Sequence, residues 1–389
     1  MEQSVVHIEQ EGEKKKTVAR GKEMLLVGLV VVVIFAGAVF AINRLQPPQM
    51  LSGQVKWTRN LGSLGSSPAI SNGIVYIGTQ ENKIYALDAN SGQVMWSAQL
   101  GKNDVRNSIL PTPVVGTGMV YANSQDGLLY ALDARTGNTV WSYQTLALAG
   151  PTVANRVVYS GSKDGLLSAL DAVSGHERWT AQIKGGLMAS PVVASDLVYV
   201  IGGGDELYAL DAQTGHEQWS RAAAGGYPPT IVDGIAYLAL SSGVVYGLDA
   251  VSGEPKWVSQ RQYTEGFSGS PVVVGDAIYV NSPDGLFALN RADGNERWIY
   301  GVPMTSAPTA PAVINGTVYV GSGDAPTVNN GALSAQPDEK LYAINAASGK
   351  AQWAYQLGGE ADTTPLVGNG VIYIGANDGT LYAVMPPGK

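Results

Sequence analysis

The 389-residue chain has no cysteine, only three histidines and 14% charged residues. Without cysteine, neither a disulfide framework nor a thiolate metal site can form. His7 lies near the N-terminus, and His176 and His216 each follow a turn glycine, so none is near a candidate nucleophilic serine. The sequence has no G-x-S-x-G elbow, no P-loop and no G-x-G-x-x-G after an expected strand. We therefore predict no catalytic, cofactor-binding or metal-ligating residues and no enzymatic activity.

Long hydrophobic runs are also absent, except at residues 24–42, where 19 positions are uncharged and almost wholly apolar. A helix of that length is ~28 Å long, close to the ~30 Å hydrocarbon thickness of a bilayer. Basic residues are more frequent before this segment than after it, so the positive-inside rule places residues 1–23 in the cytoplasm. We predict a single-pass cell-membrane protein with a transmembrane helix at 24–42, a linker at 43–52 and an extracytoplasmic remainder. The alternative is a cleaved signal peptide, because small residues lie near Ala41.

The negative charge of the chain lies after the hydrophobic segment. The tail 1–23 carries five acidic and five basic residues, so the formal net charge of −8 belongs to the rest of the chain. Such an acidic domain argues against nucleic acid or an anionic lipid surface as the main partner. We expect a protein or peptide partner in the envelope.

What the sequence does contain is a repeat. Tryptophan recurs about every 40 residues, and each interval holds a proline-led segment, a strand centred on tyrosine, and a strand resembling "YALDA". A tight turn and a strand containing the tryptophan complete the unit. Four short strands per repeat of this length are typical of a propeller blade. The eight tryptophans, which we assign to the structural repeat, are Trp57, Trp96, Trp141, Trp179, Trp219, Trp257, Trp298 and Trp353.

The two ends of the repeat region are complementary. "SGQVKW" at 52–57 is nearly identical to "SGQVMW" at 91–96, but no first three strands precede it. The last repeat, beginning at Pro365, has three strands and no tryptophan strand after them. An N-terminal strand that completes the last blade would remove the exposed edges of the ring. We predict a closed eight-bladed β-propeller of four-stranded blades over residues 53–389.

The pattern A-L-D-A-x-[ST]-G-x-x-x-W resembles the tryptophan-docking repeat of the PQQ-like β-propeller superfamily, over about residues 53–389. An eight-bladed ring of this size most resembles the BamB-like envelope proteins. The resemblance implies that each tryptophan docks between blades and that the protein is a non-catalytic protein-binding scaffold or sensor. BamB-like proteins are usually lipoproteins anchored through a cysteine, whereas this chain has the hydrophobic segment instead.

Many relatives of this fold are quinoprotein dehydrogenases that bind PQQ with Ca²⁺, and this is the alternative function. Such enzymes generally stack a tryptophan under the quinone, but every tryptophan here belongs to the repeat. Many also place adjacent cysteines over the quinone, and this chain has none. They are typically much longer. We predict no cofactor.

Two families of aspartate belong to turns. In the first, Asp133 opens the turn before the tryptophan strand, where a carboxylate accepts backbone N–H groups. Asn290 and Asn345 replace it in two later blades, keeping the acceptor but not the charge. In the second, Asp-Gly pairs such as Asp126-Gly127 are hairpin signals. Further members of the two families are Asp88, Asp171, Asp211 and Asp249, and Asp164, Asp284 and Asp378.

Variable segments mark one face of the ring. The turns before the tryptophan strands hardly vary in length, whereas 97–112, 258–269 and 321–340 depart from the repeat. Variable loops on a rigid scaffold are where binding usually occurs. The alternatives for 321–340 are a tolerated insertion, or a Ca²⁺ site formed by Asp324, Asp338 and Glu339. The predicted partner-binding residues are Lys102, Asp104, Arg106, Arg261, Tyr263, Asp324 and Asp338.

Overall fold

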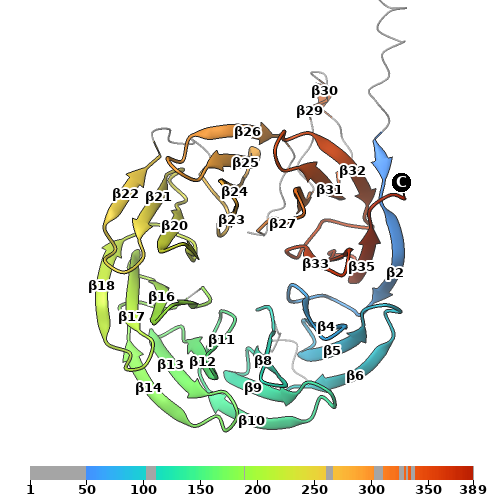
Figure 1. Ribbon diagram of the computed structural model, residues 1–389. Helices are drawn as coiled ribbons and strands as arrows, with labels where there is room; N and C mark the ends of the chain where they lie inside the picture. The colour runs from blue at the N-terminus through green and yellow to red at the C-terminus, as the bar shows by residue number, and fades with distance from the viewer. Residues whose placement is uncertain are drawn as a thin grey trace, which may run out of the picture. The chain divides into compact units, whose positions relative to one another are not determined.

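The computed structural model describes residues 50–101, 111–187, 189–259, 266–301, 310–323, 328–329, 332–333 and 338–388. Every strand in this part of the chain belongs to the unit Leu51–Lys389. Eight blades of four antiparallel strands surround a central axis, with the first strand of each nearest the axis and the fourth at the rim, and blade 7 carries a fifth, parallel strand (Figure 1). No α-helix occurs among the described residues. The predicted all-β, eight-bladed propeller is thus confirmed.

Within each blade the strands follow chain order from the axis outward, except that β2 is the outer strand of blade 8. Blades 1 to 4 contain β3 (Ala69–Ser71), β4 (Ile74–Gly78), β5 (Lys83–Asp88) and β6 (Val94–Gln99); β7 (Val114–Gly116), β8 (Met119–Asn123), β9 (Leu128–Asp133) and β10 (Thr139–Gln144); β11 (Thr152–Ala154), β12 (Val157–Gly161), β13 (Leu166–Asp171) and β14 (Glu177–Gln182); and β15 (Val192–Ala194), β16 (Leu197–Gly202), β17 (Glu206–Asp211) and β18 (Glu217–Ala222).

Blades 5 to 8 contain β19 (Thr230–Val232), β20 (Ile235–Ala239), β21 (Val245–Asp249) and β22 (Pro255–Val258); β23 (Val272–Val274), β24 (Ala277–Ser282), β25 (Gly285–Asn290) and β26 (Glu296–Tyr300); β27 (Ala312–Ile314), β28 (Thr317–Gly321), β31 (Lys340–Asn345) and β32 (Ala351–Gln356); and β33 (Leu366–Gly368), β34 (Val371–Gly375), β35 (Thr380–Met385) and β2 (Gln54–Asn60). The insertion in blade 7 lies between β28 and β31 and contains the hairpin of β29 (Val328–Asn329) and β30 (Ala332–Leu333).

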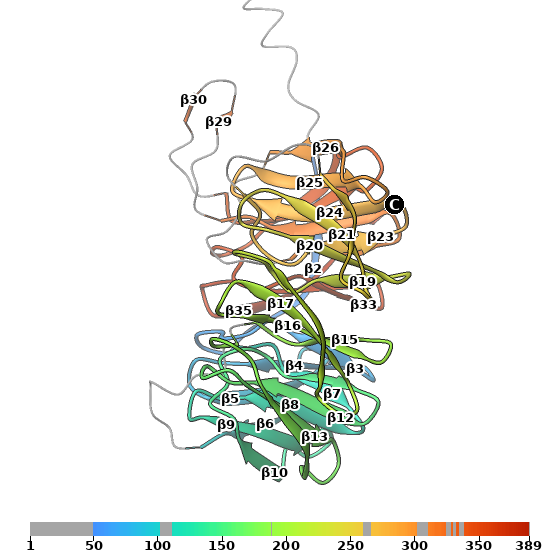
Figure 2. The same ribbon diagram turned by 90° about the vertical axis from the view of Figure 1, so that its left-hand side faces the viewer.

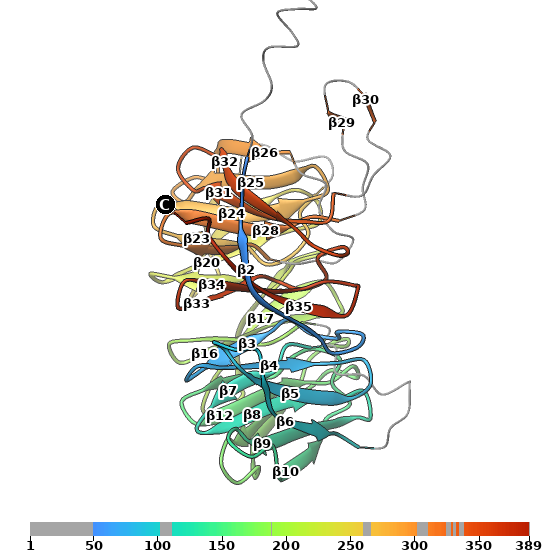
Figure 3. The same ribbon diagram turned by 90° about the vertical axis from the view of Figure 1, so that its right-hand side faces the viewer.

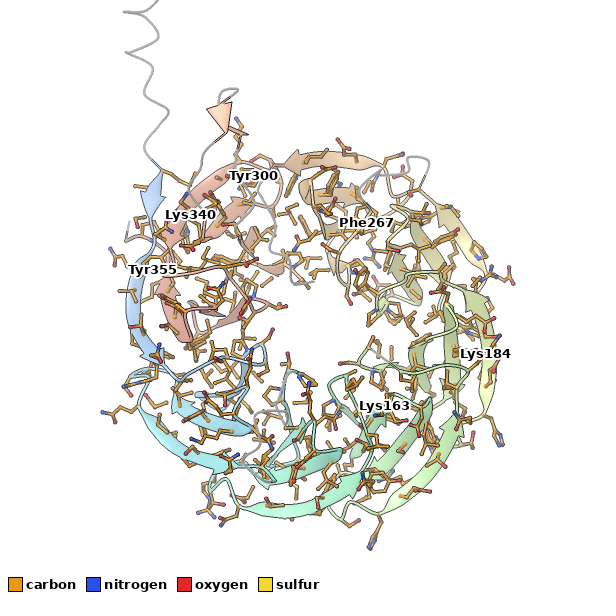
Figure 4. All side chains as sticks on the ribbon, turned by 180° about the vertical axis from the view of Figure 1, so that it is seen from behind. Lys163, Lys184, Phe267, Tyr300, Lys340 and Tyr355 are labelled. Atoms are coloured by element: carbon orange, nitrogen blue, oxygen red, sulfur yellow. The ribbon has the colours of Figure 1, made fainter. Side chains whose placement is uncertain are left out.

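The hydrophobic core lies between the blades. Eight clusters of buried side chains each combine two neighbouring blades, and side chains fill the space between the sheets (Figure 4). Between blades 1 and 2, for example, Tyr76 and Ile84 pack with Val120 and Leu132. Because both faces of a middle strand are covered in this way, these strands are buried at nearly every position, as in β8. The outer strands keep an exposed face, as in β10.

Two strands from the N-terminal end close the ring. The outer strand β2 pairs antiparallel with β35, so that Trp57 lies opposite Ala383, and this confirms the predicted closure. The preceding strand, β1 (Leu51–Ser52), pairs parallel with β32 of blade 7, and Gly53 N–H donates to the Ala354 carbonyl over 3.0 Å. Among the described residues, the first strand begins at Leu51, and the segment 51–60 joins blade 7 to blade 8 (Figure 3).

The antiparallel order of the strands divides the connections between two faces of the ring, seen from the side in Figure 2. The turn face carries the connections between first and second strands and between third and fourth strands. The loop face carries the connections between second and third strands and from blade to blade. The strands before and after the predicted variable segments 97–112, 258–269 and 321–340 meet these segments on the loop face, as the repeat predicts.

The predicted transmembrane segment, residues 24–42, lies outside the described residues. Within the part of the chain that the structure describes, no helix is long and apolar enough to cross a membrane.

Candidate functional site

Seven of the eight tryptophans contact the turn of the next blade. In blade 1, the Trp96 ring lies against Gly137 of blade 2, where a Cβ atom would approach Trp96 Cε3 to 2.5 Å. Trp96 Nε1 donates to the Ala134 carbonyl over 3.0 Å, and the Tyr76 hydroxyl donates to the same carbonyl over 3.1 Å. Two aromatic side chains of one blade are therefore held by one carbonyl of the next.

The contact between a tryptophan ring and a glycine is repeated at every blade interface. Gly53 lies before β2 and gives blade 8 the glycine that a turn supplies elsewhere, because its Cβ would lie 2.6 Å from Trp353 Cζ3. The tryptophans are thus engaged in blade packing and not turned toward a ligand. The tryptophan–glycine pairs are Trp57–Gly92, Trp96–Gly137, Trp141–Gly175, Trp179–Gly215, Trp219–Gly253, Trp257–Gly294, Trp298–Gly349 and Trp353–Gly53.

The interface between blades 5 and 6 uses a different polar contact. Arg291 occupies the position of Ala134, and its Nε donates to the Tyr237 hydroxyl over 2.7 Å. The same guanidinium pairs with Asp233 over 2.6 Å. These two hydrogen bonds raise the pKa of Arg291 above its ordinary value, so it stays charged. Sequence reasoning missed this contact, although the replacement of alanine by arginine in the repeat is visible.

The turn aspartates organise backbone. Asp133 Oδ1 accepts the N–H groups of Arg135 over 3.2 Å and Thr136 over 2.8 Å, and the Thr136 hydroxyl over 2.8 Å. The Thr136 hydroxyl is the main cause of the lowered pKa of Asp133. Asn345 Oδ1 accepts the Ser348 N–H over 2.9 Å in the same way. This turn position therefore needs an oxygen that accepts hydrogen bonds and does not need a negative charge. The role of the turn aspartates is structural.

A second carboxylate contact recurs on the loop face. The hydroxyl of Tyr130 donates to Asp126 over 2.7 Å, and that of Tyr382 donates to Asp378 over 2.6 Å. In blade 7, Tyr342 donates to Asp338 over 2.7 Å. Burial and the neighbouring carboxylate raise the pKa of each of these tyrosines, to about 12 for Tyr382.

Asp338 therefore occupies the hairpin position of blade 7. It is only 7% exposed, and its other oxygen accepts a hydrogen bond from Lys340, labelled in Figure 4. The spacing Asp-x-x-x-Tyr, shared with Asp126 and Asp378, is the sequence pattern that identifies this role. Among the described residues, no group of three or more histidine, cysteine, aspartate or glutamate side chains is placed to hold a metal ion.

The other six predicted partner-binding residues fall in the variable segments of the loop face. They lie outside the described residues, and their role stays a prediction. They are Lys102, Asp104, Arg106, Arg261, Tyr263 and Asp324.

A cavity of about 610 Å³ opens around the axis on the loop face. Its lining comes mainly from the residues before the first strands of blades 2 to 8, so it surrounds the central channel. None of these lining residues is charged. They are Pro111, Thr112, Leu148, Ala149, Gly150, Ala189, Ser190, Val192, Tyr227, Pro228, Gly269, Ser270, Ala310 and Thr364.

This lining does not fit PQQ, the cofactor that the wider fold family suggests. PQQ carries three carboxylates, which require basic side chains, and its Ca²⁺ requires several oxygen ligands that include carboxylates. The described lining offers small apolar side chains, hydroxyl groups and backbone. Such a surface suits neutral polar or apolar contacts.

Comparison with known proteins gives a family match over most of the chain. The family described as outer membrane protein assembly factor BamB matches residues 36–149, 163–332 and 320–385. The BamB of Salmonella typhimurium is 29% identical over 159 residues, which cover 40% of this chain and 36% of that protein. A tetrathionate hydrolase of Acidithiobacillus ferrooxidans is 23% identical over 158 residues, 34% of this chain and 28% of the enzyme. The chain thus spans about a third of the length of these two relatives.

Solved structures share the fold. The BamB of Moraxella catarrhalis superposes with a TM-score of 0.68 and 21% identity, over 87% of this chain and 99% of that one. A quinohemoprotein alcohol dehydrogenase of Comamonas testosteroni superposes with a TM-score of 0.66 and 15% identity, over 87% of this chain and 77% of the enzyme. At these identities the likeness concerns the fold alone.

Proposed function

The chain belongs to the family of the outer membrane protein assembly factor BamB, and on that premise we propose that its propeller is a non-catalytic protein-binding scaffold or sensor of the cell envelope. The observation that carries this proposal is the lining of the central channel, in which every described residue is uncharged. Binding PQQ with Ca²⁺ at the axis would need basic groups for the carboxylates of PQQ and carboxylate oxygens for Ca²⁺. The repeated aspartates and tryptophans, which are the obvious candidates for chemistry, are engaged in turns and blade contacts.

We propose further that residues 24–42 anchor the propeller in the cell membrane, with residues 1–23 in the cytoplasm. The length and apolar character of the segment and the bases before it support this arrangement. Full-length protein should stay in the membrane fraction after a carbonate wash, and protease should reach the propeller only from outside. A soluble form that begins near residue 42 would instead show a cleaved signal peptide.

The loop face is the proposed docking surface for a protein or peptide partner. It carries all the long departures from the repeat, and Lys102, Arg106 and Asp324 bring charge to it. A rigid ring positions such loops without needing them for stability. Asp338, which precedes β31, accepts a hydrogen bond from the Tyr342 hydroxyl.

The alternative function is a PQQ- and Ca²⁺-dependent quinoprotein dehydrogenase. A quinohemoprotein alcohol dehydrogenase is among the proteins of similar fold, so this alternative should be tested directly. The full-length chain should be titrated with PQQ in the presence of Ca²⁺, and dye reduction should be followed with alcohols and sugars. We expect neither saturable binding nor substrate-dependent reduction. Micromolar binding together with turnover would replace the scaffold assignment by an enzymatic one.

A further inference from the structure

Apart from β32 of blade 7, which pairs with β1, the outer strand of each blade is a sheet edge at the rim of the ring (Figure 1). An open edge presents unpaired N–H and C=O groups, and proteins commonly protect it with charged side chains or proline. Five of the eight outer strands here carry charged residues, and β22 also begins with Pro255. The charged residues are Lys56 and Arg59 on β2, Glu177 and Arg178 on β14, Glu217 and Arg221 on β18, Lys256 on β22, and Glu296 and Arg297 on β26.

Three outer strands carry no charge: β6 (VMWSAQ), β10 (TVWSYQ) and β32 (AQWAYQ). One of them is already occupied. The chain lays its own strand β1 on the edge of β32, where Leu51 lies opposite Trp353 and Gly53 N–H bonds to the Ala354 carbonyl. In blade 7, therefore, an uncharged outer edge binds an extended, uncharged segment.

In blades 1 and 2, no described strand pairs with the same backbone position. Ala354 follows the tryptophan of its blade, as Ser97 and Ser142 do. Leu100 N–H bonds inward to Asn82, so the alternation of an antiparallel pair turns the N–H and C=O groups of Ser97 outward. Thr145 N–H bonds inward to Gly127, with the same consequence for Ser142.

Apolar side chains lie beside these open edges. Val94 and Met95 on β6 are 44% and 52% exposed, and Val140 on β10 is 51% exposed. At the matching positions of blades 3 and 6 the chain has Glu-Arg before the tryptophan. The outer strands of the neighbouring blades 1 and 2 thus combine an edge that no described strand pairs with and exposed apolar side chains.

From this pattern we infer that the outer edges of β6 and β10 bind an extended, uncharged segment of a partner protein as a fifth strand. Backbone hydrogen bonds give such binding its affinity, and the neighbouring side chains select the sequence. The occupant is a partner protein and not a second copy of this chain, because two propellers of the same net negative charge repel each other. The inference rests on the proposed scaffold function and adds a surface distinct from the loop face.

The probe is a fluorescent, end-capped peptide with the sequence of residues 49–55, which contains β1. Binding to the full-length chain in detergent is measured by fluorescence anisotropy, with a peptide carrying proline at the positions of Leu51 and Ser52 as the negative control. We expect saturable binding with a Kd of roughly 100 μM. The double variants Val94→Glu/Met95→Arg and Thr139→Glu/Val140→Arg, combined, should weaken it at least tenfold.

These substitutions copy the Glu-Arg-Trp sequence of β14 and β26, so the combined variant should fold, and its melting temperature checks this. The matched control is Gln218→Arg, which gives the same sequence on β18, an edge already charged, and should bind like the wild type. No binding at about 1 mM peptide, or equal binding to the combined variant, would overturn the inference. If the wild type sedimented as a dimer and the combined variant as a monomer, the occupant would be a second copy of the chain, and the choice of a partner protein would be overturned. If loop-face crosslinks persist in the combined variant, the scaffold function stands whatever the fate of the edges.

Discussion

Two glycines in blade 2 separate the packing of tryptophan from the strain of the backbone. Gly137 and Gly118 both adopt left-handed conformations, with φ of 76° and 77°. A Cβ atom at Gly137 would lie 2.5 Å from the Trp96 ring, whereas a Cβ atom at Gly118 would have nothing within 4 Å. Substitution by alanine strains the backbone equally at both sites, but only Gly137→Ala displaces the indole.

The expected magnitudes follow from these two contributions. Left-handed backbone costs a residue with a Cβ atom about 1–2 kcal/mol, so Gly118→Ala should lose about that much free energy of unfolding. Overpacking a well-filled interface costs a further ~1–3 kcal/mol, so Gly137→Ala should lose about 2–5 kcal/mol in total. The difference between the variants, ~1–3 kcal/mol, measures the fit of Trp96 on the turn.

Urea unfolding followed by tryptophan fluorescence is the assay. The midpoint should shift further for Gly137→Ala than for Gly118→Ala, with equal slopes for the two variants. Equal midpoints would refute the claim that the tryptophan–glycine contact contributes to blade packing.

Three further predictions concern closure, pH and the contact at blade 6. Deleting residues 51–59 removes β1 and most of β2, and it should lower the melting temperature far more than deleting nine residues from 321–340. Asp249 has a folded pKa of about 2, below its unfolded value, so its stabilisation is complete above pH ~4 and disappears as the pH falls to ~2. Asp249→Asn should therefore flatten the loss of stability between those pH values in acid titrations. Arg291→Ala restores the alanine found in other blades, whose carbonyl can accept a hydrogen bond from the tyrosine hydroxyl. The free energy of unfolding measured with urea should therefore change by less than ~1 kcal/mol.

Much of the fold could be predicted from the sequence because the repeat is local. The segment from Trp96 to Trp141, about 45 residues long, contains the alternating patterns of four strands and the turn residues between them. The incomplete repeats at the two ends then predict the pairing of β2 with β35, because each lacks what the other has. The hydrogen bonds of Asn345 were also predictable, since its turn keeps the sequence of the aspartate turns.

Other features depend on contacts that no local pattern shows. Strand β1 has only two residues and pairs with β32, about 300 residues away, so alternation cannot reveal it. Asp338 keeps the spacing to Tyr342 that blades 2 and 8 display, but the insertion separates it from β28, so the sequence before it no longer shows a short hairpin turn. The outward position of the Ser97 backbone follows from the register with β5, which sequence alone does not fix.

Site-specific photocrosslinking in native membranes tests most directly whether the propeller is a scaffold that binds a partner on its loop face. A photoreactive residue replaces Asn103, in a loop-face segment, or Asn138, exposed on the turn face. The account predicts a discrete crosslinked protein from position 103 and none from position 138. The same products from both positions, or no product from position 103, would contradict it.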